Sequence, residues 1–143
     1  MHRSLSLLLL STAVALCATA CGSPSFSQEI QPILNQSCAV GGSSCHSATG
    51  TGGRLRLDPA SAYAALVGVA STQVPSMRMV EAGHASASFL LNKITGDMYT
   101  AVPACSSSTM NCGTRMPMLG GQTLTDAQVA LIRQWINAGA PNN

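Results

Sequence analysis

The residues with the clearest chemistry in this sequence are two cysteines and a histidine that directly follows the second of them. Cys38 and Cys45 have six residues between them, and His46 is the next residue in the chain. Two thiols with an adjacent histidine are typical of covalent haem attachment, in which the thiols bond the vinyl groups and the imidazole ligates the iron. The usual motif has two residues between the cysteines, so this loop is four residues longer.

The length of this loop leaves a second interpretation open. Cys38 and Cys45 could instead close a disulfide, and His46 would then have no ligand role. The inserted residues are rich in glycine and serine, which allows the loop to bulge without disturbing either end. The spacing therefore permits haem attachment but does not distinguish it from a disulfide.

A second pair of cysteines has no histidine after it. Cys105 and Cys112 lie in a segment rich in serine. In an exported protein the compartment is oxidising, and paired cysteines tend to be crosslinked there. We predict a disulfide between Cys105 and Cys112.

Residues 1–20 have the pattern of an export signal. Arg3 gives the start a positive charge, an apolar run with four consecutive leucines follows, and small residues precede Cys21. A cysteine in this position is similar to a bacterial lipobox, in which the thiol is acylated. The alternative is ordinary cleavage after Ala20, which leaves Cys21 free. We predict lipid attachment at Cys21 and a protein of the cell envelope, anchored to a bacterial membrane and facing the periplasm.

The chain is expected to have three parts. Residues 1–20 are the signal peptide, residues 21–24 are the lipidated N-terminus with a short tether, and residues 25–143 are one domain, a size typical of a single domain. Without the signal the charges nearly cancel, because Arg3 is lost from the seven basic residues and five acidic ones remain. Nucleic-acid-binding domains need clustered positive charge, so nucleic acid is not an expected partner.

The domain has few large side chains for its core. Its aromatic residues are Phe26, Tyr63, Phe89, Tyr99 and Trp135. Such a small core needs added support from crosslinks or from a cofactor. A buried haem would supply a large apolar body that the side chains do not.

The apolar spacing predicts helices separated by polar loops. We expect helices over 27–37, from Pro59 after a cap at Asp58, over 86–95, and from a cap at Thr125 to Gly139. Residues 54–57 are expected to be extended, and residues 97–123 to be mostly loop. No strand pattern of any length occurs, so the predicted class is all-α with irregular loops.

These residues together resemble a known family, the small class I cytochrome c domains. The similarity is closest to the cytochrome c-like domains of exported lipoproteins common in myxobacteria and planctomycetes. It covers nearly all of the chain after the signal. The matching stretches are Ile30–Leu34, Cys45-His46, Gly52–Asp58, Ser88–Leu90, Cys112–Pro117, Leu124-Thr125 and Ile132–Ala140.

The resemblance implies a cofactor and a role for four residues. Cys38 and Cys45 would carry the thioether bonds of haem c, His46 would be the proximal iron ligand, and Met116 would be the distal ligand. A His–Met pair raises the reduction potential and suits electron transfer. The implied function is a membrane-anchored single-electron carrier that meets redox partner proteins. It is not expected to be an enzyme, because both axial positions are filled.

Other assignments stay open at this point. Met118 or His84 could replace Met116 as the distal ligand. The chain could also be a haem-free, disulfide-stabilised structural or binding lipoprotein on the same fold. A further alternative is a copper site, because soft ligands favour copper(I). The ligands of that site would be Met77, Met79, Met116, Met118 and His46.

Overall fold

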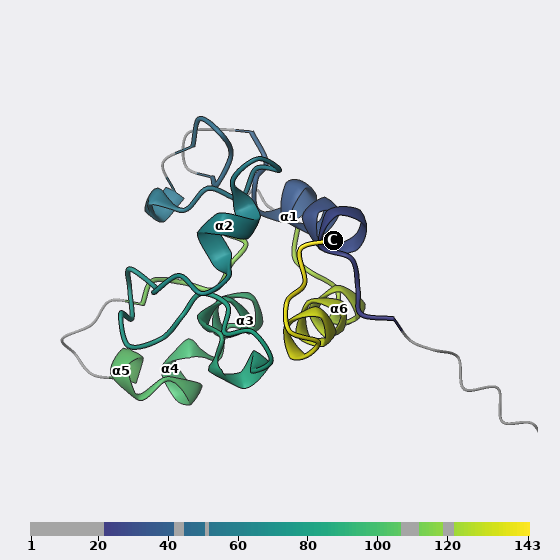
Figure 1. Ribbon diagram of the computed structural model, residues 1–143. Helices are drawn as coiled ribbons and strands as arrows, with labels where there is room; N and C mark the ends of the chain where they lie inside the picture. The colour runs from purple at the N-terminus through teal and green to yellow at the C-terminus, as the bar shows by residue number, and fades with distance from the viewer. Residues whose placement is uncertain (1–21, 42–44, 51, 107–111, 119–121) are drawn as a thin grey trace, which may run out of the picture.

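The computed structural model describes residues 22–41, 45–50, 52–106, 112–118 and 122–143. The described residues form helices and loops without a named strand, and their only β contacts are isolated bridges, which confirms the all-α class (Figure 1). The predicted signal peptide and Cys21 lie outside the described residues. The elements in chain order are η1 (Phe26–Ile30), α1 (Gln31–Ser37), η2 (Gly52–Arg54), α2 (Ala62–Leu66), η3 (Ala85–Ala87), α3 (Phe89–Thr95), α4 (Met98–Ala101), α5 (Pro103–Ser106) and α6 (Asp126–Asn137).

The first predicted helix divides into a π turn and an α-helix. The hydroxyl of Ser25 accepts a hydrogen bond from the backbone of Gln28 and caps η1. Pro32 then stands near the start of α1, where its missing N–H and fixed φ are tolerated. Because a proline crowds the carbonyl four residues before it, the widened turn immediately before α1 is where the chain accommodates it.

One predicted boundary was wrong. α2 starts at Ala62 and not at Pro59, because the carbonyl of Asp58 accepts from Ser61 and Ala62 in a turn that precedes the helix. The segment 97–123, expected to be mostly loop, is mostly loop where it is described, and it also contains the short helices α4 and α5. Met98 of α4, Cys105 of α5 and Val102 between the two helices are buried in a small apolar cluster, so packing stabilises helices too short to form on their own.

The last two predicted helices were close to the observed ones. α3 ends at Gly96, which has a left-handed φ of 84°, as a glycine at this position readily adopts. α6 begins with the full capping box between Thr125 and Gln128. It ends before Gly139, whose φ is 96°.

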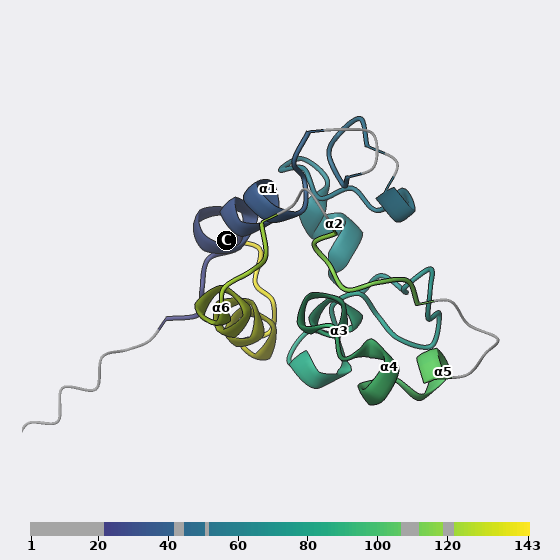
Figure 2. The same cartoon turned by 180° about the vertical axis from the view of Figure 1, so that it is seen from behind.

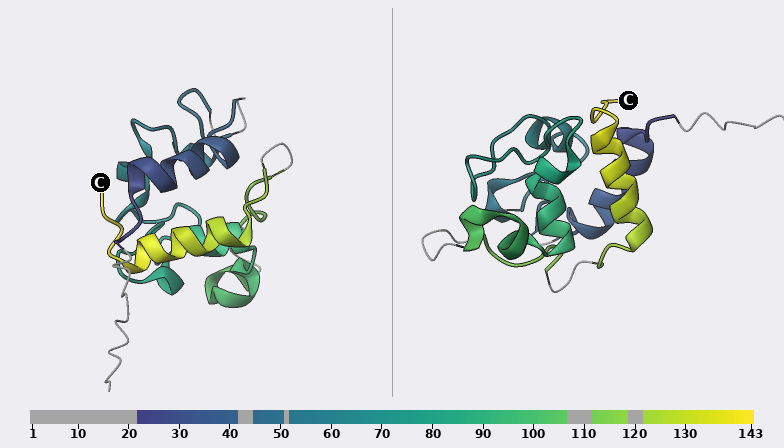
Figure 3. Two further views of the ribbon diagram at one scale, coloured as in Figure 1. Left: turned by 90° about the vertical axis from the view of Figure 1, so that its right-hand side faces the viewer. Right: turned by 90° about the horizontal axis from the view of Figure 1, so that it is seen from below.

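Helices α1 and α6 frame the main core. They run in opposite directions, so the carboxyl end of α1 and the amino end of α6 lie on the same side of the molecule (Figure 3). The N-terminus of the domain is joined to its C-terminus, because the backbone N–H groups of Phe26 and Ser27 both donate to Asn143. This side-by-side arrangement places the loop after α1 and the segment before α6 on one side of the domain.

Candidate functional site

The backbone of His46 lies against the end of α1. Cys38 is the C-cap residue of this helix, and its N–H donates to Leu34. The backbone N–H of His46 donates to the carbonyl of Cys38 over 3.1 Å. The longer spacing between the cysteines therefore still brings Cys45 and His46 next to Cys38.

The two thiols of this loop are free. Cys38 is 9% exposed, and Cys45 is half-buried. Burial, and to a smaller extent the charge of the neighbouring Cys45, raises the pKa of Cys38 to about 11. A thiol that is almost entirely protonated near neutral pH is a slow partner in disulfide exchange.

The second pair has the other arrangement. Cys105 and Cys112 are joined by a disulfide, as predicted, across a sequence separation of 7. Cys38 and Cys45 have the same separation in the sequence and are not joined. Separation alone does not decide the state of a pair, so the difference lies in the surroundings of each.

The ring of His46 is held in one orientation. Its Nδ1 lies 3.0 Å from the carbonyl oxygen of Leu55. A carbonyl oxygen only accepts, so this bond assigns the proton to Nδ1 and leaves the lone pair on Nε2. Histidines that ligate metals usually donate their other ring N–H in this way. A second bond joins the same two stretches of chain, because the N–H of Leu57 donates to the carbonyl of His46.

The residue after His46 carries an unpaired polar group. The hydroxyl oxygen of Ser47 is buried and has no hydrogen-bond partner in the described part of the chain. Buried polar groups are nearly always paired, so a hydroxyl without a partner beside His46 is consistent with a site that receives a further group. The two free thiols and the open Nε2 are the donor types that a covalently attached haem would need.

Met116 comes from a separate segment that α3 holds. The backbone N–H of Met116 donates to the carbonyl of Lys93 over 2.8 Å, and Nε of Arg115 donates to the carbonyl of Ile94 over 2.9 Å. The segment 112–118 runs past α3 toward α2 (Figure 2). Met116 is half-buried. It belongs to neither of the two apolar clusters of the described residues.

The two alternative distal ligands have different surroundings. Met118 is 57% exposed. His84 is exposed at the start of η3, and its neighbours Gly83 and Ala85 bond to the last residues of α6. The carboxyl end of α6 lies opposite the carboxyl end of α1 (Figure 3). His84 therefore stands at the far end of the domain from Cys38, as a surface residue near a helix start.

Two methionines of the copper interpretation, Met77 and Met79, have packing roles. Met77 is packed against the smaller apolar cluster, and Met79 against both clusters. In the ranges that the structure describes, no group of three or more histidine, cysteine, aspartate or glutamate side chains could hold a metal ion. No helix in those ranges is long and apolar enough to cross a membrane.

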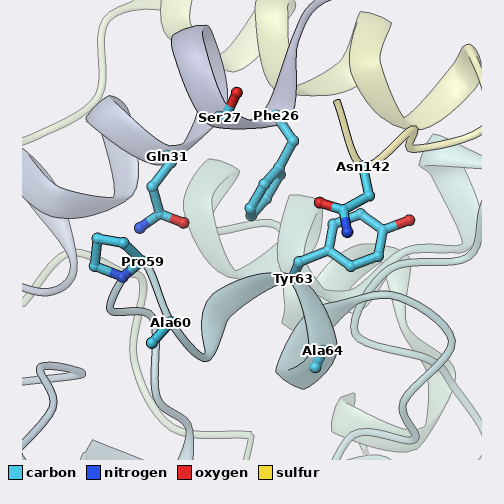
Figure 4. A pocket seen from close by; sticks show the side chains of 8 residues that line it. All are labelled: Phe26, Ser27, Gln31, Pro59, Ala60, Tyr63, Ala64 and Asn142. Carbon is cyan, nitrogen blue, oxygen red and sulfur yellow. The ribbon is translucent and has the colours of Figure 1, made fainter.

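A pocket of about 360 Å³ lies away from these residues, between η1, α2 and the C-terminus (Figure 4). One wall is the amide of Gln31, whose oxygen is buried without a partner in the described chain while its nitrogen donates to Leu57 and Asn35. None of the predicted ligands lines it. The lining residues are Phe26, Ser27, Gln31, Pro59, Ala60, Tyr63, Ala64 and Asn142.

Sequence patterns did not single out two groups that support the site. The carbonyl of Leu55 orients His46 through a bond across nine residues, and no local signal marks a backbone carbonyl. Lys93 reaches the segment before Met116 from α3. Lys93 could have been noticed in the sequence, because it is the single lysine of the chain.

The free thiols of Cys38 and Cys45 should react at different rates. At pH 8 Cys38 is expected to alkylate at least about tenfold more slowly than Cys45, because it is buried and its raised pKa of about 11 keeps the thiolate fraction near a thousandth. The rate should rise as the pH approaches 11. Peptide mapping by mass spectrometry after timed iodoacetamide treatment measures both. In denaturant the rates should converge, and equal rates in the folded protein would contradict the burial of Cys38.

No family model matches this chain, and no curated protein matches it significantly. Among solved structures, it is similar to the hydrazine synthase of Kuenenia stuttgartiensis, with 21% sequence identity and a TM-score of 0.48. The similarity covers 81% of this chain and 16% of that one. The chain therefore spans a small part of the length of this neighbour.

Proposed function

We propose that this chain is a c-type cytochrome, anchored by lipid at Cys21 in the cell envelope, that carries single electrons between redox partner proteins. The observation that carries the proposal is the orientation of His46, whose Nδ1 is engaged by Leu55 and whose Nε2 is left open beside two free thiols. A disulfide-stabilised lipoprotein without haem would need neither feature.

Each residue of the site has a distinct task in this proposal. Cys38, at the end of α1, and Cys45 would hold the haem covalently, so that it would stay bound in both oxidation states. The carbonyl of Leu55 keeps His46 in the tautomer that presents Nε2. The haem supplies the reversible one-electron chemistry, and a His–Met environment favours a raised potential. His46 and Met116 would both hold the iron and leave no place for a substrate, so the proposed role is that of a carrier and not of an enzyme.

Spectroscopy of the mature protein tests the proposal directly. The full chain is produced in a host competent for cytochrome c maturation, and its absorption spectrum and in-gel haem stain are recorded. A Soret band and haem that persists in a denaturing gel are expected. Colourless protein in which Cys38 and Cys45 are crosslinked to each other would establish the haem-free lipoprotein instead. Stoichiometric copper without haem would establish the copper protein.

Replacing Met116 by alanine should change the haem without releasing it. The covalent attachment and His46 are untouched, so the haem stain should match that of the wild type. The low-spin spectrum should change, and the reduction potential should fall by on the order of 0.1 V, within the range of about 0.8 V that axial ligands span. Met118→Ala is the matched control, because Met118 is two residues away and exposed. If Met118→Ala alters the spectrum and Met116→Ala does not, Met118 is the ligand.

A further inference from the structure

The single lysine of this chain is buried. Lys93 lies on α3 and is 6% exposed. Burial lowers its pKa. Lysine is almost never this buried unless its charge is compensated by partners. The buried ammonium group of Lys93 therefore needs hydrogen-bond partners.

The ammonium group of Lys93 holds two carbonyls of the segment that carries Met116. Nζ donates to Cys112 and to Thr114, each over 2.7 Å. The backbone carbonyl of the same lysine accepts from Met116 over 2.8 Å. Lys93 thus contacts every second residue of the segment. Its side chain binds Cys112 and Thr114, and its main chain binds Met116.

Two further contacts join this segment to the same part of the chain. Arg115 donates to the carbonyl of Ile94, and Tyr99 donates to the carbonyl of Gly113 over 2.7 Å. Cys112 is fully buried and tied by its disulfide to Cys105. Among these contacts only Lys93 reaches the residues on both sides of Gly113 and also Met116 itself. Bonds from a charged donor in a buried setting are stronger than neutral ones.

We infer that Lys93 is a positioning residue for the axial methionine: it fixes the segment 112–116 on α3 so that Met116 is held in place for the iron. The inference rests on the proposed function. A merely structural lysine would stabilise the domain and leave the identity of the axial ligand unchanged. A positioning lysine also controls how firmly Met116 stays bound.

The test is the haem-loaded Lys93→Met variant. Methionine is similar in length and apolar, so it fills the buried space but leaves the carbonyls of Cys112 and Thr114 without their donor. We expect the in-gel haem stain to match that of the wild type, because Cys38, Cys45 and His46 are unchanged. The charge-transfer band of the methionine–iron(III) bond should fall several-fold, and the reduction potential should drop. Lys93→Arg, which keeps charge and donors, should restore most of the band.

Leu91→Ala is the matched control for stability. Leu91 is buried on the same helix, so its truncation weakens α3 without removing a bond to the segment. This variant should lose stability and keep the methionine–iron band. If Leu91→Ala and Lys93→Met lose the band in proportion to their loss of stability, the positioning role is overturned. Should Lys93→Met not fold, Lys93→Gln is measured by the same criteria.

A second measurement needs no haem. In the full chain made without maturation, the amide of Met116 should exchange with deuterium roughly ten- to a hundredfold faster in Lys93→Met than in the wild type. Unchanged exchange overturns the inference. A wild type that never binds haem overturns the proposed function and the inference together. A wild type with a methionine-ligated haem and an unaltered Lys93→Met spectrum overturns the inference alone.

Discussion

Replacing both Cys38 and Cys45 by alanine is expected to abolish covalent haem completely. Thioether bonds need both thiols, and His46 alone gives at most a haem that a denaturing gel strips from the chain. The change to the fold should be small, because alanine at the end of α1 removes only one buried sulfur from the main cluster. In-gel haem staining and the intact mass of the protein, both after expression with the maturation system, measure the result.

The other cysteine pair provides a control with the same separation in the sequence. Replacing Cys105 and Cys112 by alanine should leave the haem covalently attached and lower the free energy of unfolding by about 2–4 kcal/mol, since a crosslink is lost. The two double variants should therefore have different phenotypes. The variant without Cys38 and Cys45 should lose covalent haem, and the variant without Cys105 and Cys112 should lose stability. Haem retained without Cys38 and Cys45, or lost without Cys105 and Cys112, would falsify the assignment of the pairs.

Helix ends with local chemistry could be predicted from the sequence. Thr125 and Gln128 cap each other within one turn of α6, and Gly96 ends α3, so short-range patterns contained the whole interaction. α4 and α5 could not be predicted in this way. They are four residues each and depend on the burial of Met98 and Val102 in a cluster formed by distant segments. The cytochrome c-like assignment of the fold stays a proposal.

The candidate site also has a part that the sequence predicts and a part that depends on contacts between distant residues. Cys45 and His46 are adjacent, and Cys38 is near in sequence, so the motif could be recognised from the sequence alone. Leu55 contacts the ring of His46, and Lys93 contacts the backbone of Met116. These contacts hold the two residues in position. The bond from Lys93 to Cys112 spans 19 residues, and only the packing of α3 against the later segment brings the two together. A lysine in an apolar helical pattern gives no indication of its partners.

Replacing Trp135 by alanine should have the largest effect on stability. Its ring is fully buried in the main cluster, 5.3 Å from the ring of Phe26, which in turn packs edge-on against Tyr63 at 5.1 Å. Truncating a buried tryptophan costs about 3–5 kcal/mol, a large part of the roughly 5–15 kcal/mol that keeps a domain folded. Equilibrium unfolding in urea, followed by circular dichroism on haem-free protein, measures the loss.

Trp135→Phe separates the ring from its hydrogen bond. The indole Nε1 donates to the carbonyl of Pro141 over 3.0 Å, in the segment that leads to Asn143 and back to Phe26. Phenylalanine keeps most of the apolar contact but leaves that carbonyl without its donor, so a smaller loss of about 1–3 kcal/mol is expected. Trp135 would then have two roles, because its ring packs in the core and its Nε1 holds the C-terminal segment. A Trp135→Ala protein that unfolds within 1 kcal/mol of the wild type would show instead that the remaining packing among the helices is sufficient without this ring.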